Sequence, residues 1–305
     1  MYNILFRAAW FSLKTMLAKE KWCGAQAGMM AVLHTWGQNL SFHPHLHCVV
    51  PAGGLAFDEN EWIDTKKAGI LVDVVKLSTL FRQTFLRLLR EQWEFQGIEF
   101  RGKAKKYEDI TEWRALFDSL QQPWVVYAKK PSTGPKQTLE YLSRYTHAVA
   151  ISEGRILDLN QQKVSIQYKD YADEDEQGIP KKKEMELDGL VFINKFVQHI
   201  LPSGFQKIRY FGIWASTNRK TKLRKAQKIL KQVPITLTMK IIRVMVQQKL
   251  GIDPTICRHC GSANIVTQIL IPQPFTLPKV VPQPLPIPLS RPPPKVRRSQ
   301  QVVAF

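Results

Sequence analysis

The chain has 305 residues, 44% of them hydrophobic, which allows one sizeable core or a core with a small appended module. No apolar run of about eighteen residues is present, and the N-terminus lacks the pattern of a signal peptide, so we expect a cytoplasmic protein outside the membrane. The four cysteines are too few and too scattered for a secreted disulfide framework.

The net charge of +19 is concentrated in the C-terminal part of the chain. Residues 1–188 hold 25 Lys/Arg against 24 Asp/Glu, whereas residues 189–305 hold 19 Lys/Arg against one acid, Asp253. Such a surface attracts polyanions, and each phosphate contact releases counterions from nucleic acid, so DNA or RNA is the favoured partner. A membrane lipid surface and a generic basic face are the alternatives.

Hydrophobic periodicity predicts alternating helices and strands as far as residue 233. Helices are expected at 5–17, 75–95, 111–120, 138–146, 189–201 and 219–233. Strands are expected within 28–40 and 45–54, with a short bend at 41–44 between them, and at 123–128, 147–152, 155–159, 163–172 and 207–215. An exposed hairpin tip is expected around the acidic run 173–176 and Lys181 to Lys183. Ten prolines between Pro272 and Pro294 indicate an extended tail.

Four of the seven histidines fall between positions 34 and 47, and three of them alternate in the sequence HPHLH. On a strand, His45 and His47 point to the same face while Leu46 turns into the core, which is a geometry for two metal ligands. Cys48, on the opposite face from His47, is expected to be a core residue. His34 and Gln38 are both candidates for a third ligand on the preceding strand. The alternatives are histidines that hydrogen-bond at a sheet surface, and a zinc hydrolase, for which an HExxH helix is missing.

Tyr141 and Tyr145 are four residues apart and would share one face of the helix predicted at 138–146. A tyrosine hydroxyl can attack a phosphodiester when a metal polarises the phosphate, and a phosphotyrosine bond conserves the energy needed for rejoining. Arg144, between them, could clamp the scissile phosphate, or it could form a surface ion pair with Glu140. Without the histidines, the same spacing is more typical of core aromatics.

The segments HTWGQNLSFHPHLHCVVPAGGL and YLSRYTHAVAIS together resemble the IS91-type rolling-circle transposases, which are two-tyrosine HUH transposases. The resemblance extends over roughly residues 4–262. It implies metal-dependent nicking of one DNA strand with Mg²⁺ or Mn²⁺, a 5′-phosphotyrosine intermediate, and strand transfer to a target. His45 and His47 match the HUH ligands, and Tyr141 and Tyr145 match the nucleophile pair.

The chain departs from that family at its N-terminus, since members normally begin with a cysteine-rich zinc module and a first strand of the nuclease sheet. We therefore expect an N-terminally truncated protein. Near the other end, Cys257 and Cys260 flank His259 in a zinc-type knuckle, and a structural Zn²⁺ there would need further ligands.

The predicted fold is α+β, with an antiparallel sheet of the HUH endonuclease type flanked by helices. We divide the chain into a catalytic domain at 1–188, a basic DNA-binding region at 189–262 and a disordered proline-rich tail at 263–305. The basic residues expected to bind DNA are Arg219, Lys220, Lys222, Arg224, Lys225 and Lys228. Tyr210, Phe211 and Trp214 could stack on unpaired bases, although core packing is expected for at least two of them.

The predicted function is that of a single-strand DNA-cleaving transposase acting at the bacterial nucleoid. One alternative is a non-catalytic DNA-binding remnant of such an enzyme. Another is a replication initiator or relaxase with the same chemistry.

Overall fold

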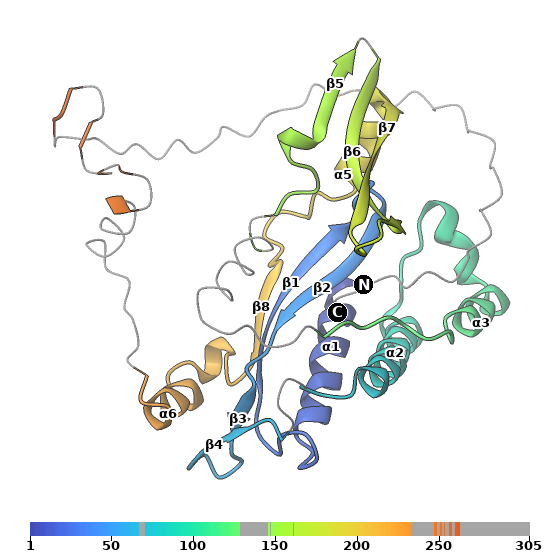
Figure 1. Cartoon of the computed structure of the whole chain (residues 1–305). Coiled ribbons are helices and arrows are strands. Elements are labelled where there is room, and N and C mark those ends of the chain that lie inside the picture. The colour runs from blue at the N-terminus through green and yellow to red at the C-terminus, as the bar shows by residue number, and fades with distance from the viewer. Residues whose placement is uncertain are drawn as a thin grey trace. The chain divides into compact units, whose positions relative to one another are not determined.

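The computed structural model describes residues 1–66, 71–128, 146, 148–160 and 162–232, and short stretches of one to three residues between 247 and 262. Contacts divide the chain into two compact units, and residues 1–232 lie in the first. That unit combines helices with antiparallel sheets, which confirms the predicted α+β class (Figure 1). In the described part of the chain, no helix is long and apolar enough to cross a membrane.

The central sheet has the strand order β2-β1-β8, and both strand pairs are antiparallel. Its strands are β1 (Gly28–Trp36), β2 (Phe42–Val49) and β8 (Ile208–Gly212). Helices α1 (Tyr2–Leu17) and α2 (Val74–Glu91) lie together on one face of this sheet (Figure 1). Phe211 of β8 marks the contact, since its ring stacks on Trp10 of α1 at a centroid distance of 5.7 Å. The helices predicted at 5–17 and 75–95 are thus confirmed, and together they form the layer that covers the sheet.

The turn after β8 brings the chain against the start of β1. Gly212 has φ +62°, and a Cβ atom there would meet the carbonyl oxygen of Ala27 at 2.0 Å. Only glycine allows this backbone conformation and this close approach together.

The strand β2 begins earlier than expected, because Phe42, His43 and Pro44 are part of it rather than of a bend. The pairing register shifts between His34 and Trp36, where two residues of β2 face only Thr35. Such a bulge suits Pro44, which has no N–H to contribute to a regular ladder.

A second helical layer follows α2. A π-helical turn, η1 (Gln92–Gln96), and a 3₁₀ segment, η2 (Gly102–Glu108), lead to α3 (Ile110–Ser119), which confirms the helix predicted at 111–120. The strand predicted at 123–128 is wrong, since these residues form no strand. Trp124 packs on Phe81 and Phe85 of α2 and Val126 is buried in the main core, while Val125 and Tyr127 are exposed.

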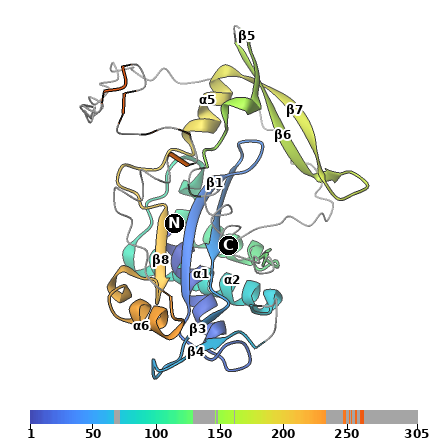
Figure 2. The same cartoon turned by 60° about the vertical axis from the view of Figure 1, so that its left-hand side comes forward.

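A second antiparallel sheet contains β5 (Ile156–Asn160), β6 (Lys163–Glu174) and β7 (Pro180–Asp188), preceded by the turn η3 (Glu153–Arg155) (Figure 2). The exposed hairpin tip between β6 and β7 confirms the prediction, and Lys181 forms an ion pair with Asp173 across it at 2.8 Å. Helix α5 (Gly189–Val197) follows β7, with Asp188 as its N-cap. The described residues of the strand predicted at 147–152 are irregular, although Ala150 and Ile151 are buried.

The tip of the β1–β2 hairpin is anchored in the second sheet. Leu40, with φ +56°, is only 1% exposed and packs with Ala150, Ile151, Val164 and Ile166. The guanidinium of Arg155 donates to the carbonyl oxygens of Gln38 and Gln167 and so links the two sheets.

The remaining elements are β3 (Gly53–Leu55), β4 (Trp62–Asp64), the turn η4 (Ser216–Asn218) and α6 (Lys222–Ile229). Helix α6 is the basic helix predicted at 219–233, and it is shorter at both ends. Strand β8 lies beyond the boundary predicted after residue 188, yet it pairs with β1 of the central sheet. The proline-rich tail predicted at 263–305 lies outside the described residues.

Candidate metal centre

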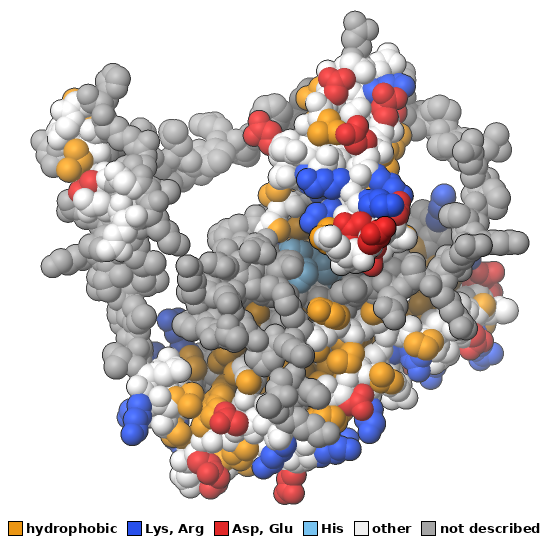
Figure 3. Space-filling view, viewed as in Figure 1, with side chains coloured by type: hydrophobic (Ala, Val, Ile, Leu, Met, Phe, Trp, Pro, Cys, Tyr) orange, Lys and Arg blue, Asp and Glu red, His pale blue; other side chains and the backbone are white. Residues whose placement is uncertain are grey.

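Three histidines meet on the face of the central sheet that is opposite α1 and α2. His34 of β1 pairs directly with His45 of β2, and His47 lies two residues further along β2. The candidate ligand atoms of the three rings all lie within 4.8 Å of one another. His34 is buried, while His45 and His47 are partly exposed, and histidine side chains reach the surface on the face shown in Figure 3.

The strand alternation around the pair is as the sequence predicts. Leu46 lies between the two histidines, faces the helical layer and is fully buried in the main core. Cys48 packs against the same core, and burial raises the pKa of its thiol to about 12. The Cys48 thiol is therefore a core group and stays protonated at neutral pH.

A backbone contact orients the ring of His45. Its Nδ1 atom lies 2.7 Å from the carbonyl oxygen of His43. Because a carbonyl oxygen can only accept a hydrogen bond, Nδ1 carries the proton and the lone pair of the neutral ring is on Nε2. This Nε2 atom lies 3.1 Å from Nε2 of His47. Metal–nitrogen bonds of about 2.1 Å place neighbouring ligand atoms roughly 3 Å apart, so the spacing fits two ligands of one ion.

Burial keeps His45 and His47 of β2 neutral. The pKa of His45 is lowered to about 4, mainly by desolvation; the hydrogen bond to the His43 carbonyl raises it, and the nearby His34 and His43 rings lower it. Desolvation, followed by the proximity of His34 and His45, lowers the pKa of His47 to about 2. Only a neutral imidazole can donate its lone pair to a cation. These rings are already neutral at neutral pH, so they need not lose a proton before they bind a metal ion.

The donor set fits a divalent transition ion. Three imidazole nitrogens suit such ions better than Mg²⁺, which prefers oxygen ligands. The structure brings His34 to the pair, whereas Gln38 lies in the turn after β1 has ended at Trp36. The expectation that Gln38 continues the strand face of His34 is therefore wrong, because the hairpin turns before that position.

Two residues near the centre were missed by sequence reasoning. Trp36 stacks on His34 at a centroid distance of 4.5 Å, and its position two residues after His34 on the strand could have revealed it. His199 is buried, and its Nδ1 atom lies 3.2 Å from Thr35 Oγ1. No local pattern predicts that contact, because 164 residues separate its partners.

The other predicted site residues cannot be placed in the same way. Tyr141, Arg144 and Tyr145 lie outside the described residues. Cys257 and Cys260 are described but His259 between them is not, so a structural Zn²⁺ there stays a prediction.

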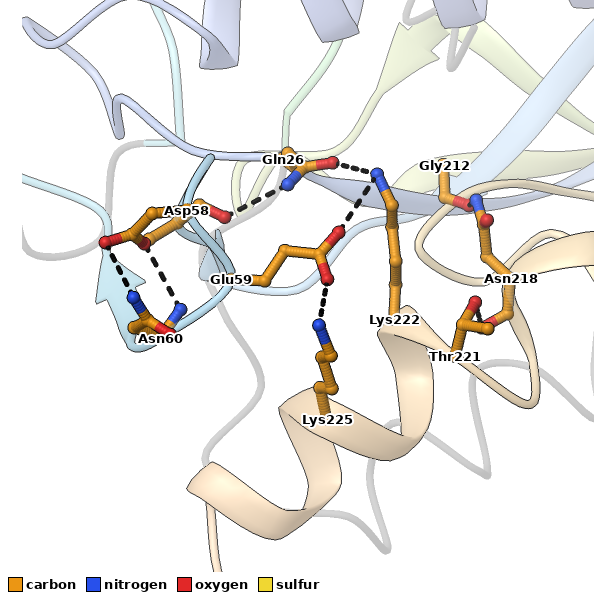
Figure 4. Close-up of polar contacts among 10 residues, drawn as sticks. Gln26, Asp58, Glu59, Asn60, Gly212, Asn218, Thr221, Lys222 and Lys225 are labelled. Carbon is orange, nitrogen blue, oxygen red and sulfur yellow. Dashed lines mark hydrogen bonds and ion pairs between the residues drawn. The ribbon is translucent and has the colours of Figure 1, made fainter.

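The basic residues predicted to bind DNA divide into two groups around α6. Lys222 and Lys225 both form ion pairs with Glu59, and Lys222 also donates to the side chain of Gln26 (Figure 4). Lys222 and Lys225 thereby attach the helix to the segment between β3 and β4. The other four side chains are exposed: Arg219, Lys220, Arg224 and Lys228.

The aromatic residues near α6 differ in exposure. Tyr210 is 55% exposed and pairs with Met30, which puts it on the histidine-bearing face of the sheet. Phe211 packs into the main core and Trp214 packs near Ile213, so the expected core packing of two of the three is confirmed.

Comparison with known proteins identifies relatives for most of the chain. Residues 28–222 match the Y2_Tnp family, described as "Putative transposase". A "Putative transposase" of Sinorhizobium fredii is 38% identical over 272 residues, which cover 88% of this chain and 67% of that protein. The "Transposase for insertion sequence element IS801" of Pseudomonas savastanoi pv. phaseolicola is 27% identical over 272 residues, covering 88% of this chain and 62% of that protein. No solved structure matches the chain.

The chain thus spans about two thirds of the length of these two relatives. The family match includes all three strands of the histidine-bearing sheet, from β1 to β8. The identity to the first relative holds over most of the chain rather than over a short motif. The chain therefore belongs to the Y2_Tnp family of transposases.

Proposed function

We propose that this chain is a transposase that nicks and transfers single-stranded DNA through a metal-dependent phosphotyrosine intermediate. The observation that carries the proposal is the convergence of His34, His45 and His47 on one sheet face. Family membership supports action on DNA, because one relative is named as the transposase of an insertion sequence. Such a protein would act on nucleoid DNA in the bacterial cytoplasm.

His34, His45 and His47 would hold the ion. A bound divalent cation would supply positive charge to a phosphate oxygen and so favour attack at phosphorus. The hydrogen bond from His45 to the carbonyl oxygen of His43 would keep that ring oriented as a ligand. From the donor chemistry we expect Mn²⁺ to support activity better than Mg²⁺.

Tyr141 and Tyr145 are the proposed nucleophiles, on the strength of their sequence spacing. The phenol oxygen would form a bond to the scissile phosphorus as the bond from phosphorus to the 3′ oxygen breaks. The phenol loses its proton and the leaving 3′ oxygen gains one, so the products are a 5′-phosphotyrosine and a free 3′-OH. Arg144 would bind a phosphate oxygen, and the second tyrosine would allow a second linkage for transfer.

A denaturing gel with labelled single-stranded DNA from the element's ends tests this proposal. The wild type should form a covalent adduct in Mn²⁺ and none in a chelator. The adduct should be lost in His34→Ala, in His45→Ala and in the double variant Tyr141→Phe with Tyr145→Phe. Tyr127→Phe is the matched control, because Tyr127 is an exposed tyrosine outside the predicted pair.

An adduct that persists in the double tyrosine variant would overturn the proposed nucleophiles. An adduct that forms without metal would overturn the role of the three histidines. Salt-sensitive DNA binding with no adduct in any metal would instead identify a DNA-binding remnant.

A further inference from the structure

A small apolar cavity of about 220 Å³ lies beside helix α6. Its walls come from Pro51 after β2, from β4, from the turn after β8 and from α6 with the residues just after it, and Figure 2 shows β4, β8 and α6 together. The side chains that carry the argument are Trp62, Trp214, Leu223, Ala226, Gln227 and Leu230. The metal centre is a separate site. The cavity lies at the end of β1 where Gly28 pairs with Gly212. Gly28 is six residues from His34, which is about 20 Å along the strand.

Helix α6 presents three faces with different partners. Leu223, Ala226, Gln227 and Leu230 follow the 3–4 residue spacing of one helical face, and all four line the cavity. Lys222 and Lys225 lie on a second face and are held by Glu59 (Figure 4).

The third face of α6 carries the exposed side chains of Arg224 and Lys228. They are four residues apart, so they lie one turn from each other along the helix. Around the helix axis, this third face lies next to Gln227, which belongs to the cavity face. The apolar cavity therefore has a cationic border that the ion pairs with Glu59 do not neutralise.

The lining of the cavity suits a flat aromatic ring. Its volume is below the roughly 300–1,000 Å³ of pockets that hold drug-sized ligands, so it can take one small ring system. Two tryptophans contribute to its walls, and the indole nitrogen of Trp62 donates to Asp64 at 3.0 Å, which orients that ring. Gln227 and Gln232 add amide donors and acceptors to a lining that is otherwise apolar.

We propose that this cavity binds one unpaired nucleobase of single-stranded DNA, while Arg224 and Lys228 contact the adjacent phosphates. A flat apolar ring attached to a polyanion is the ligand that matches an apolar cavity with a cationic border. The inference rests on the proposed function for its choice of DNA. It assigns to α6 a base contact in addition to the expected contacts with phosphate.

Fluorescence anisotropy in a chelator, with the full chain, tests the proposal without involving the nicking reaction. The probes are a labelled thymidine oligonucleotide and an abasic oligonucleotide of the same length. Leu230→Trp should fill the cavity, and Trp62→Leu should remove an aromatic wall. Leu190→Trp is the matched control, because Leu190 is 63% exposed on α5 and lies outside the cavity.

We expect both cavity variants to bind the thymidine oligonucleotide about 5- to 150-fold more weakly than the wild type, the range expected for losing one stacked base. Binding of the abasic oligonucleotide should be unchanged, which also shows that the variants are folded. Leu190→Trp should change neither affinity, and Arg224→Ala should weaken both.

Unchanged thymidine binding in Leu230→Trp, or an equal loss for both oligonucleotides, would overturn the nucleobase site. Adduct formation is measured separately, so the two proposals can fail independently. A base-dependent loss of affinity in a protein that forms no adduct would refute nicking and keep the nucleobase site.

Discussion

The partly buried His45 and His47 should make the metal-free protein sensitive to acid. The pKa of His47 is about 2 in the folded protein, against an ordinary value of 6.5 that applies in the unfolded chain. Between these values the unfolded state binds a proton that the folded state does not, so stability falls as the pH falls below 6.5. At about pH 5, roughly 1.5 pH units below the unfolded pKa, this costs about 2 kcal/mol. His45, with a folded pKa of about 4, should contribute similarly at that pH.

Urea denaturation in a chelator, at about pH 7.5 and about pH 5, measures this loss. Carboxylates and other histidines also titrate, so the comparison is with His47→Asn, which removes one titrating ring and keeps a polar side chain of similar size. The wild type should lose about 2 kcal/mol more than the variant between the two pH values. An equal loss in both proteins would refute the argument that burial keeps His47 neutral.

Three further predictions concern the scaffold around the site. Leu46→Ala should lower the free energy of unfolding by about 2–5 kcal/mol, because Leu46 is fully buried, and a urea titration at neutral pH would detect it. Gly212→Ala should lower the melting temperature more than an alanine substitution at the exposed Gly154, since its Cβ would meet the carbonyl oxygen of Ala27. Glu59→Gln should cause a small loss of thermal stability that disappears at high salt, because it removes the ion pairs of two partly exposed lysines. A loss that persists in high salt would show that these ion pairs are not its cause.

The predictions that succeeded depend on local periodicity. Alternation in HPHLH determines that His45 and His47 share a face and that Leu46 faces the core, whatever the strand pairs with. The same holds for the amphipathic helices α1 and α2 and for the hairpin of β6 and β7, whose polar tip the acidic run marks.

The predictions that failed depend on partners distant in the sequence. An apolar run at 123–128 has the composition of a strand, yet Trp124 packs on helix α2, and in the described part of the chain no strand pairs with the run. The segment 41–44 has the composition of a bend, but a bulge lets Pro44 remain inside β2.

The sequence by itself determined the pair of histidines, the basic character of α6 and the family resemblance, because these are carried by residue type and short spacing. Only the tertiary structure decided that His34 joins the pair, since the register of β1 against β2 puts it opposite His45 while the hairpin turns before Gln38. The cavity beside α6 likewise exists only after folding, because its walls come from segments between Pro51 and Gln232. Chain pairing over such distances is set by the burial of whole faces, which no local pattern specifies.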